Sequence, residues 1–446
     1  MREISKDNLL RSWKEIAAYL GCDVRTCHRW EDQRGMPVHR AEGSEKKSPV
    51  FAYKDEIDAW FKGTFRTSDT TKMKAVPAQP VSPWLKWALA VAAVVVLAGA
   101  FFREGGLLVK RQPADFAIEG SVLVALDKHQ QELWRWDSGM EDLEQEPYYR
   151  AHFQVLDHNA GNILPALIMK DIDGDGGTEV LFAPKRIIDQ TGEGVLYCFD
   201  RKGTEIWNFP AGKELRCGGT VYSPDYRIAG FHTHDFDGDG RCEIIVEAFH
   251  APDWPCQLAL LDSSGKRLGE YWNAGYLRDI EYCDLDGDGR EELIVVGVNK
   301  EYRSGCLVVL DPLRMGGSSP QTGKFACEGL GPGTELFYVV TPPSDVAEAL
   351  GLYWADLVHL GITENRRIRA TSTLGLNYEF GFDLKPLQVT PADGFKSLHR
   401  KLAAEGKISS VLDDAYMRGI LGDVRYWNGS ALTAEPSPNT AGAASR

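Results

Sequence analysis

The chain has 446 residues, of which 43% are hydrophobic and 26% charged, and this composition excludes both a wholly disordered protein and a polytopic membrane protein. The net charge of -14 is unevenly spread: residues 1–81 contain 15 Lys and Arg against 12 Asp and Glu, whereas residues 87–446 contain 34 against 52. A slightly basic head on an acidic body predicts two parts with different partners.

The nine cysteines are too few for a disulfide scaffold in a chain of this length, and no C-x-x-C motif occurs. Seven of them lie in the body, an odd number that leaves at least one unpaired. We expect most of them to be small buried side chains.

Residues 9–63 are predicted to form a small domain that contains a helix-turn-helix. Ser12 and Glu15 form a capping box at the start of a helix over WKEIAAYL, and Gly21 ends that helix in the left-handed conformation. A second helix, over VRTCHRWED, follows after a three-residue turn. A loop, a strand over PVFAY and a last helix over KDEIDAWF complete the domain.

The order SWKEIAAYLG, RWE, GMPVHR and VFAYKDEIDAWF resembles the winged-helix domains of the MerR and excisionase type. The resemblance implies that the head binds DNA, with its second helix at a major groove and its wing near phosphate. One such module buries a small interface, so we expect it to bind as a dimer. The alternative is a small domain that binds protein and carries solvated surface charges. The candidate DNA-contacting residues are Arg25, Thr26, His28, Arg29, Lys46 and Lys47.

The segment 84–102 contains an uncharged run, WALAVAAVVVLAGAFF. As a helix with a rise of about 1.5 Å per residue, this segment would be about 28 Å long, close to the ~30 Å hydrocarbon core of a bilayer. We therefore predict a single transmembrane helix over 84–102, preceded by a flexible linker over 64–83. Lys62 and Arg66 favour a cytoplasmic N-terminus. The alternative is a buried core helix.

Three segments of the body share one pattern, with carboxylates at loop positions 1, 3, 5 and 9 and glycines between them. Hard oxygen ligands at alternate positions are what Ca²⁺ requires, and the backbone carbonyl at position 7 would add another. The loops lack a Glu at position 12 and lead into β-branched strands, which excludes an EF-hand. The predicted calcium ligands are Asp171, Asp173, Asp175 and Glu179 in the first loop, Asp235, Asp237, Asp239 and Glu243 in the second, and Asp284, Asp286, Asp288 and Glu292 in the third.

These loops resemble the calcium loops of FG-GAP (VCBS-type) repeats, as in the integrin α-subunit propeller. The resemblance implies that each loop lies within a β-hairpin of a propeller and that Ca²⁺ is the cofactor. The alternative is a set of acidic surface turns that bind nothing.

A second element recurs after each loop: a strand that ends in Asp, a turn, and another strand. Each unit therefore contains four strands, which is one propeller blade. Trp207 and Trp272 occupy matching places, and we expect both to pack between blades. Residues 331–430 show further strand-like runs with two helical stretches, and we expect degenerate blades with insertions there.

A fourth copy of the strand pair, at residues 121–136, has no calcium loop before it. We expect it to supply only the outer strands of a blade that is completed by strands from beyond residue 330, since such closure removes exposed sheet edges.

The predicted fold class is therefore multidomain. It combines a small α-helical winged-helix head, one transmembrane helix, and a mainly-β propeller body over 115–430 with calcium-loop blades. Residues 431–446 are rich in Ala, Ser, Thr and Pro, and we expect a disordered tail.

The sequence contains no G-x-S-x-G, H-E-x-x-H or phosphate-loop motif, and we do not expect an enzyme. The function we expect is a single-pass, membrane-anchored bacterial transcriptional regulator or sensor. Its cytoplasmic head would bind DNA, and its extracytoplasmic calcium-binding body would recognise a carbohydrate or a protein. The alternatives are a cell-surface adhesion or scaffold protein whose head binds protein, and a polysaccharide-acting propeller enzyme.

Overall fold

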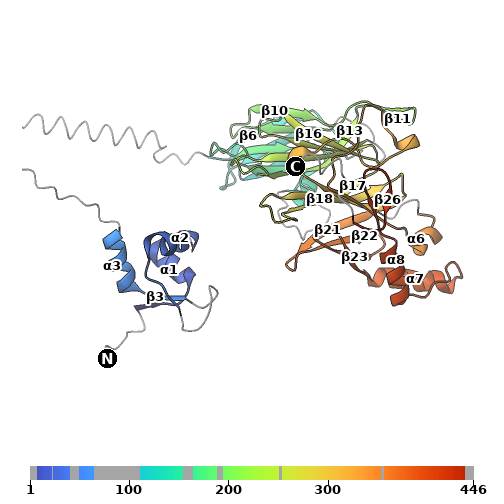
Figure 1. Ribbon diagram of the computed structural model, residues 1–446. Coiled ribbons are helices and arrows are strands. Elements are labelled where there is room, and N and C mark those ends of the chain that lie inside the picture. The colour runs from blue at the N-terminus through green and yellow to red at the C-terminus, as the bar shows by residue number, and fades with distance from the viewer. Residues whose placement is uncertain are drawn as a thin grey trace, which may run out of the picture. The chain divides into compact units, whose positions relative to one another are not determined.

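The computed structural model describes residues 8–22, 24–40, 50–64, 111–153, 164–187, 194–250, 254–352 and 356–436. The chain divides into two compact units, residues 1–100 and 101–446, and each is described by itself (Figure 1). None of the helices within the described ranges is both long and apolar enough to cross a bilayer. The transmembrane helix expected over 84–102, and the linker beyond Thr64, lie outside those ranges.

The described residues of the first unit form three helices and a small antiparallel sheet. Its helices are α1 (Trp13–Leu20), α2 (Val24–Arg34) and α3 (Lys54–Thr64). The sheet has the strand order β1-β3-β2, with bounds Leu9–Leu10, Val50–Tyr53 and His39–Arg40. The described part of the head thus has the helix, turn and strand order that the sequence predicted.

The start and end of α1 follow from its sequence. The Ser12 hydroxyl accepts a hydrogen bond from the Glu15 backbone N–H at 3.3 Å, and the Glu15 carboxylate accepts one from the Arg11 backbone N–H at 2.8 Å. Gly21 ends the helix with a φ of 66°, a conformation that glycine adopts without strain. The capping box is confirmed, although Glu15 reaches the residue before the N-cap.

The core of the head lies between the helices and the sheet. Ile16, Cys27 and Ile57 are fully buried in it, and the indoles of Trp13, Trp30 and Trp60 pack around them. Phe61 is 39% exposed at the edge of this core, with its ring against Trp30. It lies one position beyond Trp60, so the helical rotation turns it toward the rim.

The described residues of the body form five antiparallel sheets of three or more strands that follow one another along the chain, together with one two-stranded hairpin, and we number the five sheets blade 1 to blade 5 (Figure 1). Blade 1 has three strands: β4 (Asp115–Glu119), β5 (Val122–Leu126) and β6 (Glu132–Asp137). A short helix, α5 (Glu146–Ala151), follows it. Blade 2 has four strands: β7 (Leu167–Lys170), β8 (Glu179–Phe182), β9 (Val195–Phe199) and β10 (Glu205–Pro210).

The next two blades repeat the same meander. Blade 3 is formed by β13 (Tyr226–His234), β14 (Glu243–His250), β15 (Cys256–Leu261) and β16 (Arg267–Asn273). Blade 4 is formed by β17 (Leu277–Cys283), β18 (Glu292–Asn299), β19 (Ser304–Leu310) and β20 (Phe337–Thr341). A hairpin of β11 (Leu215–Cys217) and β12 (Thr220–Tyr222) lies between blades 2 and 3 in sequence, and two 3₁₀ turns, Pro312–Arg314 and Gly323–Phe325, lie between β19 and β20.

The C-terminal third contains a fifth blade with helical insertions, as expected. Its strands are β21 (Leu357–Thr363), β22 (Arg367–Ser372), β23 (Leu376–Gly381) and β24 (Pro386–Pro391). The helices are α6 (Asp345–Ala349), α7 (Asp393–Ala404) and α8 (Asp414–Gly422), and they lie close together beside blade 5 in Figure 1. The sequence analysis anticipated the first two helices but not α8.

Consecutive blades are joined by a repeated contact between an indole and a glycine turn. Trp134 of blade 1 packs over Gly203, in the β9–β10 turn, and Trp207 of blade 2 packs over Gly265, in the β15–β16 turn. Both glycines have a positive φ, and a Cβ atom at either would come within 2.6 Å of the indole. Trp272 is buried in the core cluster that joins blades 2 and 3. The expectation that Trp207 and Trp272 pack between blades is confirmed.

The expected closure of the ring is wrong. Within the described ranges, the sheet that contains residues 121–136 consists of β4, β5 and β6 alone, and no strand from beyond residue 330 joins it. The C-terminal strands β25 (Arg425–Trp427) and β26 (Leu432–Thr433) instead extend blade 4, because β25 pairs with β20. The tail expected to be disordered over 431–446 therefore begins with a strand, while residues 437–446 lie outside the described ranges.

Candidate functional site

The three acidic segments form three loops with one common geometry. Each loop connects the first and second strands of its blade: β7 to β8, β13 to β14, and β17 to β18. An Asp follows the last residue of the first strand, and the loop then contains two glycines with φ between 76° and 89°. These left-handed glycines turn the backbone sharply enough to bring alternate carboxylates together. The expectation that the loops lie within β-hairpins is confirmed.

The same hydrogen bonds recur in every loop. In the second loop, the Asp235 carboxylate accepts hydrogen bonds from the Gly238 and Gly240 backbone N–H groups at 2.7 and 3.0 Å. Asp237 accepts one from the Asp239 N–H at 3.0 Å. The equivalent bonds in the first loop are 2.8, 3.0 and 3.0 Å, and in the third 2.6, 3.1 and 3.2 Å. Backbone N–H groups thus fix the carboxylates in a preformed arrangement.

The carboxylate at position 9 of each loop is buried at the base. Glu179, Glu243 and Glu292 are 4%, 4% and 6% exposed, and each accepts a hydrogen bond from the backbone N–H at position 2. Burial raises the pKa of Glu179, the carboxylates of Asp173, Asp175 and Asp171 add to this effect, and the resulting pKa is about 7. Burial also raises the pKa of Glu243. A bound divalent cation would offset this crowding of negative charge.

Each loop brings three carboxylates close enough to hold one cation. Their ligand atoms lie within 4.8 Å of one another in Asp171, Asp173 and Glu179, in Asp235, Asp237 and Asp239, and in Asp284, Asp286 and Asp288. Oxygen-only ligands on a tight loop are suited to Ca²⁺. All twelve predicted ligands are described and lie at these three loops, and the triads are compatible with metal binding.

The loops of neighbouring blades also contact one another. The Cys242 N–H of the second loop donates to the Ile172 carbonyl of the first at 2.8 Å. The His234 imidazole, just before the second loop, hydrogen-bonds Glu291 of the third. The Arg366 guanidinium of blade 5 donates to the Asp284 and Leu285 carbonyls at 3.3 and 3.2 Å. The first loop is held to blade 1 by Gln112, whose amide pairs with the Gly176 carbonyl. The loops therefore form one continuous end of the body.

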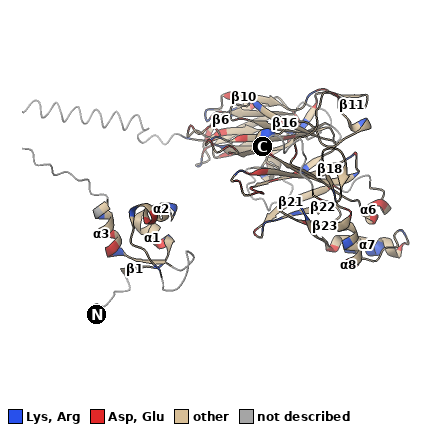
Figure 2. Ribbon diagram, viewed as in Figure 1, with Lys and Arg blue, Asp and Glu red and all other residues tan. Residues whose placement is uncertain are grey.

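The predicted DNA-contacting residues of α2 lie on one face. Arg25, His28 and Arg29 are exposed, Thr26 is half-buried, and the His28 ring packs on Trp13 with centroids 4.0 Å apart. Figure 2 shows that α2 carries acidic as well as basic positions. Lys46 and Lys47, predicted on the wing, lie outside the described residues.

A disulfide that was not predicted from the sequence joins Cys217 of β11 to Cys327, 110 residues later in the chain. The seven other cysteines all lie in the described ranges and form no disulfide there, and five of them are buried, as expected for small apolar side chains. The spacing of the two half-cystines gives no motif, so the sequence alone could not have identified the pair.

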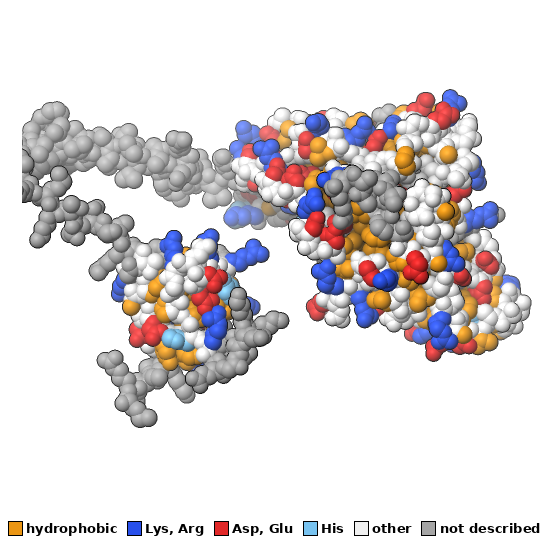
Figure 3. All heavy atoms as spheres, in the orientation of Figure 1, with side chains coloured by type: hydrophobic (Ala, Val, Ile, Leu, Met, Phe, Trp, Pro, Cys, Tyr) orange, Lys and Arg blue, Asp and Glu red, His pale blue; other side chains and the backbone are white. Residues whose placement is uncertain are grey.

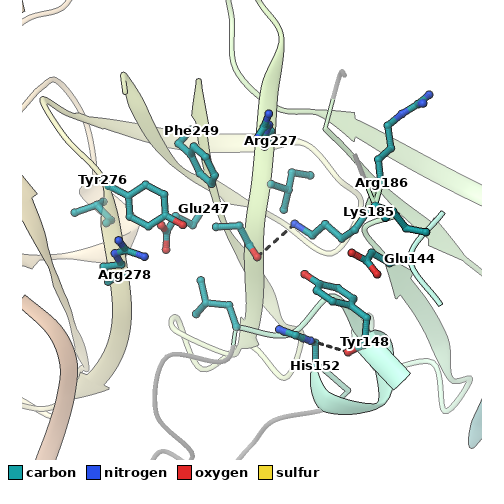
Figure 4. A pocket seen from close by; sticks show the side chains of 15 residues that line it. Glu144, Tyr148, His152, Lys185, Arg186, Arg227, Glu247, Phe249, Tyr276 and Arg278 are labelled. Carbon is teal, nitrogen blue, oxygen red and sulfur yellow. Dashed lines mark hydrogen bonds between the residues drawn. The ribbon is translucent and has the colours of Figure 1, made fainter. Parts of the chain in front are cut away.

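A pocket of about 320 Å³ opens at the end of β13 and β17 that lies opposite the acidic loops (Figure 4). The acidic loops follow the last residues of β13 and β17, whereas the pocket is formed by the first residues of these strands together with β14, α5 and the segment after β8. Its described lining comprises Glu144, Tyr148, His152, Leu164, Lys185, Arg186, Ile187, Arg227, Ile228, Ala229, Glu247, Phe249, Tyr276, Leu277 and Arg278. None of these residues was predicted to be a site residue from the sequence.

No protein-family model matches the chain, and no curated protein matches it. Among solved structures it is similar to BamB from Moraxella catarrhalis, at 13% identity and a TM-score of 0.33, over 63% of this chain and 62% of that one. It is also similar to the Dos1 propeller, at 8% identity and a TM-score of 0.34, over 63% of this chain and 59% of that one. The rhamnogalacturonan lyase YesW is similar at 16% identity and a TM-score of 0.29, over 49% of this chain and 41% of that one. The chain thus spans less than two thirds of each of these proteins, and the likenesses extend to the propeller fold alone.

Proposed function

We propose that the body is a calcium-stabilised recognition domain that binds a carbohydrate or a protein. The observation that supports this proposal most directly is the threefold repetition of one loop geometry, in which backbone N–H groups hold three carboxylates within 4.8 Å of one another. Three independent loops that contact each other would let bound ions stiffen a whole end of the body. The surface visible in Figure 3 carries both charge signs interspersed, as suits a soluble recognition domain.

We also propose that this body works outside the cytoplasm. The Cys217–Cys327 disulfide supports the proposal, because structural disulfides persist mainly in oxidising compartments. Calcium modules with weak sites suit the same compartments, where the ion is abundant. The apolar segment 84–102, between head and body, would then be the single membrane anchor.

The head is proposed to bind DNA in the cytoplasm as a dimer, which would make the protein a membrane-anchored transcriptional regulator. The exposed side chains of Arg25, His28 and Arg29 on the second helix of a helix-turn-helix support this proposal. The rival proposal is an adhesion or scaffold protein whose head binds protein. DNA phosphates are bound by basic side chains, and α2 carries acidic side chains as well. This mixed charge is compatible with a head that binds protein.

Protease protection in sealed vesicles that carry the full chain tests the proposed topology. With the cytoplasmic face outward, protease should remove the head and leave the body intact. Digestion of both parts from the same side would overturn the regulator proposal. A salt-sensitive gel shift of the full chain on DNA from upstream of its own gene would then separate the regulator from the scaffold.

A further inference from the structure

One side chain in the pocket is buried without a partner. Glu247 on β14 is 0% exposed, and neither oxygen of its carboxyl group has a hydrogen-bond partner among the described residues. It lines the pocket between blades 2, 3 and 4 (Figure 4). A buried carboxyl group that makes no hydrogen bond is costly, so its retention needs an explanation. A ligand that enters the pocket would supply the missing partner.

The groups around Glu247 are mainly basic. Arg278, Arg227 and Lys185 line the pocket from blades 4, 3 and 2, and Glu144 is the one acidic residue besides Glu247 in the described lining. The Arg278 guanidinium pairs with Asp356 at 3.3 Å, and the Lys185 ammonium donates to the Ala229 carbonyl at 3.4 Å. This excess of cations favours a ligand that carries an anionic group.

Aromatic rings form the walls between these polar groups. The rings of Phe249 and Tyr276 have centroids 4.6 Å apart, and the Arg278 guanidinium lies 4.2 Å from the centroid of Tyr276. On the facing side, Tyr148 stacks on His152 at 4.1 Å. Flat apolar faces beside a few convergent polar groups are typical of small-molecule sites, and about 320 Å³ suits a ligand of one or two sugar rings.

We propose that this pocket binds an acidic saccharide, a sugar that carries a carboxylate. The carboxylate would meet Arg278, Arg227 and Lys185, and the apolar face of the ring would lie against Tyr276 and Phe249. A sugar hydroxyl would bond Glu247, because a hydroxyl both donates and accepts and thus satisfies this carboxyl group whether or not it carries a proton. This inference deepens the proposed recognition function by naming the class of its ligand.

Calorimetric titration of the full-length protein in saturating Ca²⁺ tests the proposal. The probes are galacturonate, its neutral counterpart galactose, and acetate, which has a carboxylate but no ring. Galacturonate should bind at least about tenfold more tightly than either control, because only it can use both the basic groups and Glu247. Equal binding of galactose or acetate, equal binding of inorganic phosphate, or no binding of galacturonate would overturn the proposal.

Two variants keep the result interpretable. Glu247→Met keeps the side-chain volume and removes an unpartnered carboxyl group, so it should fold while galacturonate affinity falls by about tenfold or more. Arg227→Leu should weaken the binding of galacturonate and leave the weak binding of galactose unchanged. The matched control is Glu205→Gln, an exposed position on β10. Unchanged affinity in both pocket variants would overturn the proposal. If galacturonate does not bind but calcium still stabilises the protein, this inference alone is contradicted. The proposal of a calcium-stabilised domain is then unaffected.

Discussion

The backbone N–H of Cys242 donates a hydrogen bond of 2.8 Å to the carbonyl of Ile172. Cys242 belongs to the second acidic loop and Ile172 to the first, so two loops on different blades share one hydrogen bond. Ile172 also donates its own N–H to Glu179, the buried carboxylate at the base of the first loop. An ion bound in one loop would therefore order a peptide group that supports its neighbour.

This contact predicts that the first two loops are coupled. Asp237→Asn should lower the calcium affinity of the second loop by about tenfold or more, since it removes a charged ligand. It should also weaken binding at the first loop, to a smaller extent. Calcium titrations of single and double variants of the two loops measure this coupling as a departure from additivity. Glu141→Gln, at an exposed position outside the loops, is the matched control. Strictly additive effects would contradict the coupling.

The disulfide should contribute strongly to the stability of the body. It closes a loop of 110 residues that contains all of blade 3. Replacing both half-cystines, as in Cys217→Ser with Cys327→Ser, should lower the free energy of unfolding by about 2–5 kcal/mol. A reductant should lower the melting temperature of the wild-type chain but not that of the double variant. Equal melting of the wild-type chain with and without reductant would count against a structural role.

The buried acid predicts a pH dependence of stability. Burial raises the pKa of Glu247 to about 8, although the charge of Arg278 lowers it. Between about pH 4.5 and 8, the folded chain therefore keeps a proton on Glu247 that the unfolded chain has already released. The stabilisation from the neutral carboxyl group is complete below this window and is lost as the pH rises through it. In saturating Ca²⁺, Glu247→Gln should flatten the fall in melting temperature between pH 5 and 8. Glu281, whose pKa burial also raises to about 8, should account for part of the remaining slope. An unchanged slope in Glu247→Gln would contradict the assignment.

The head offers a direct test of DNA binding. The double change Arg25→Ala with Arg29→Ala should weaken binding about tenfold or more and make it less dependent on salt, because it removes two cations from the helix expected to lie in the major groove. Gel shifts at two salt concentrations measure both effects. Lys62→Ala, an exposed change on α3, should have no effect. If the double variant shifts DNA as well as the wild type does, α2 is not the contact helix.

The features that the sequence predicted are those set by local chemistry. The capping box at Ser12, the left-handed Gly21 and the hairpin position of each Asp-rich loop all depend on residues within about ten positions of one another. The β-strands around the loops follow from runs of β-branched residues that are buried on both faces, as in β18.

The remaining features arise from contacts between distant segments. Blade 1 was expected to recruit a strand from the C-terminus, but β25 pairs with β20 instead, and pairing of distant strands leaves no local signal. The disulfide joins cysteines 110 residues apart. Glu247 looks like any acidic residue in a strand sequence. Its burial becomes evident only once the blades around it are assembled.

A calorimetric titration of the calcium-stripped, full-length protein with Ca²⁺, paired with its melting curve, shows whether the three acidic loops bind calcium. We expect uptake of three ions per chain, one for each loop, and a melting temperature that rises with calcium concentration because the ions bind only the folded form. A chain that takes up no calcium, or melts identically in Ca²⁺ and in excess EDTA, would contradict this expectation.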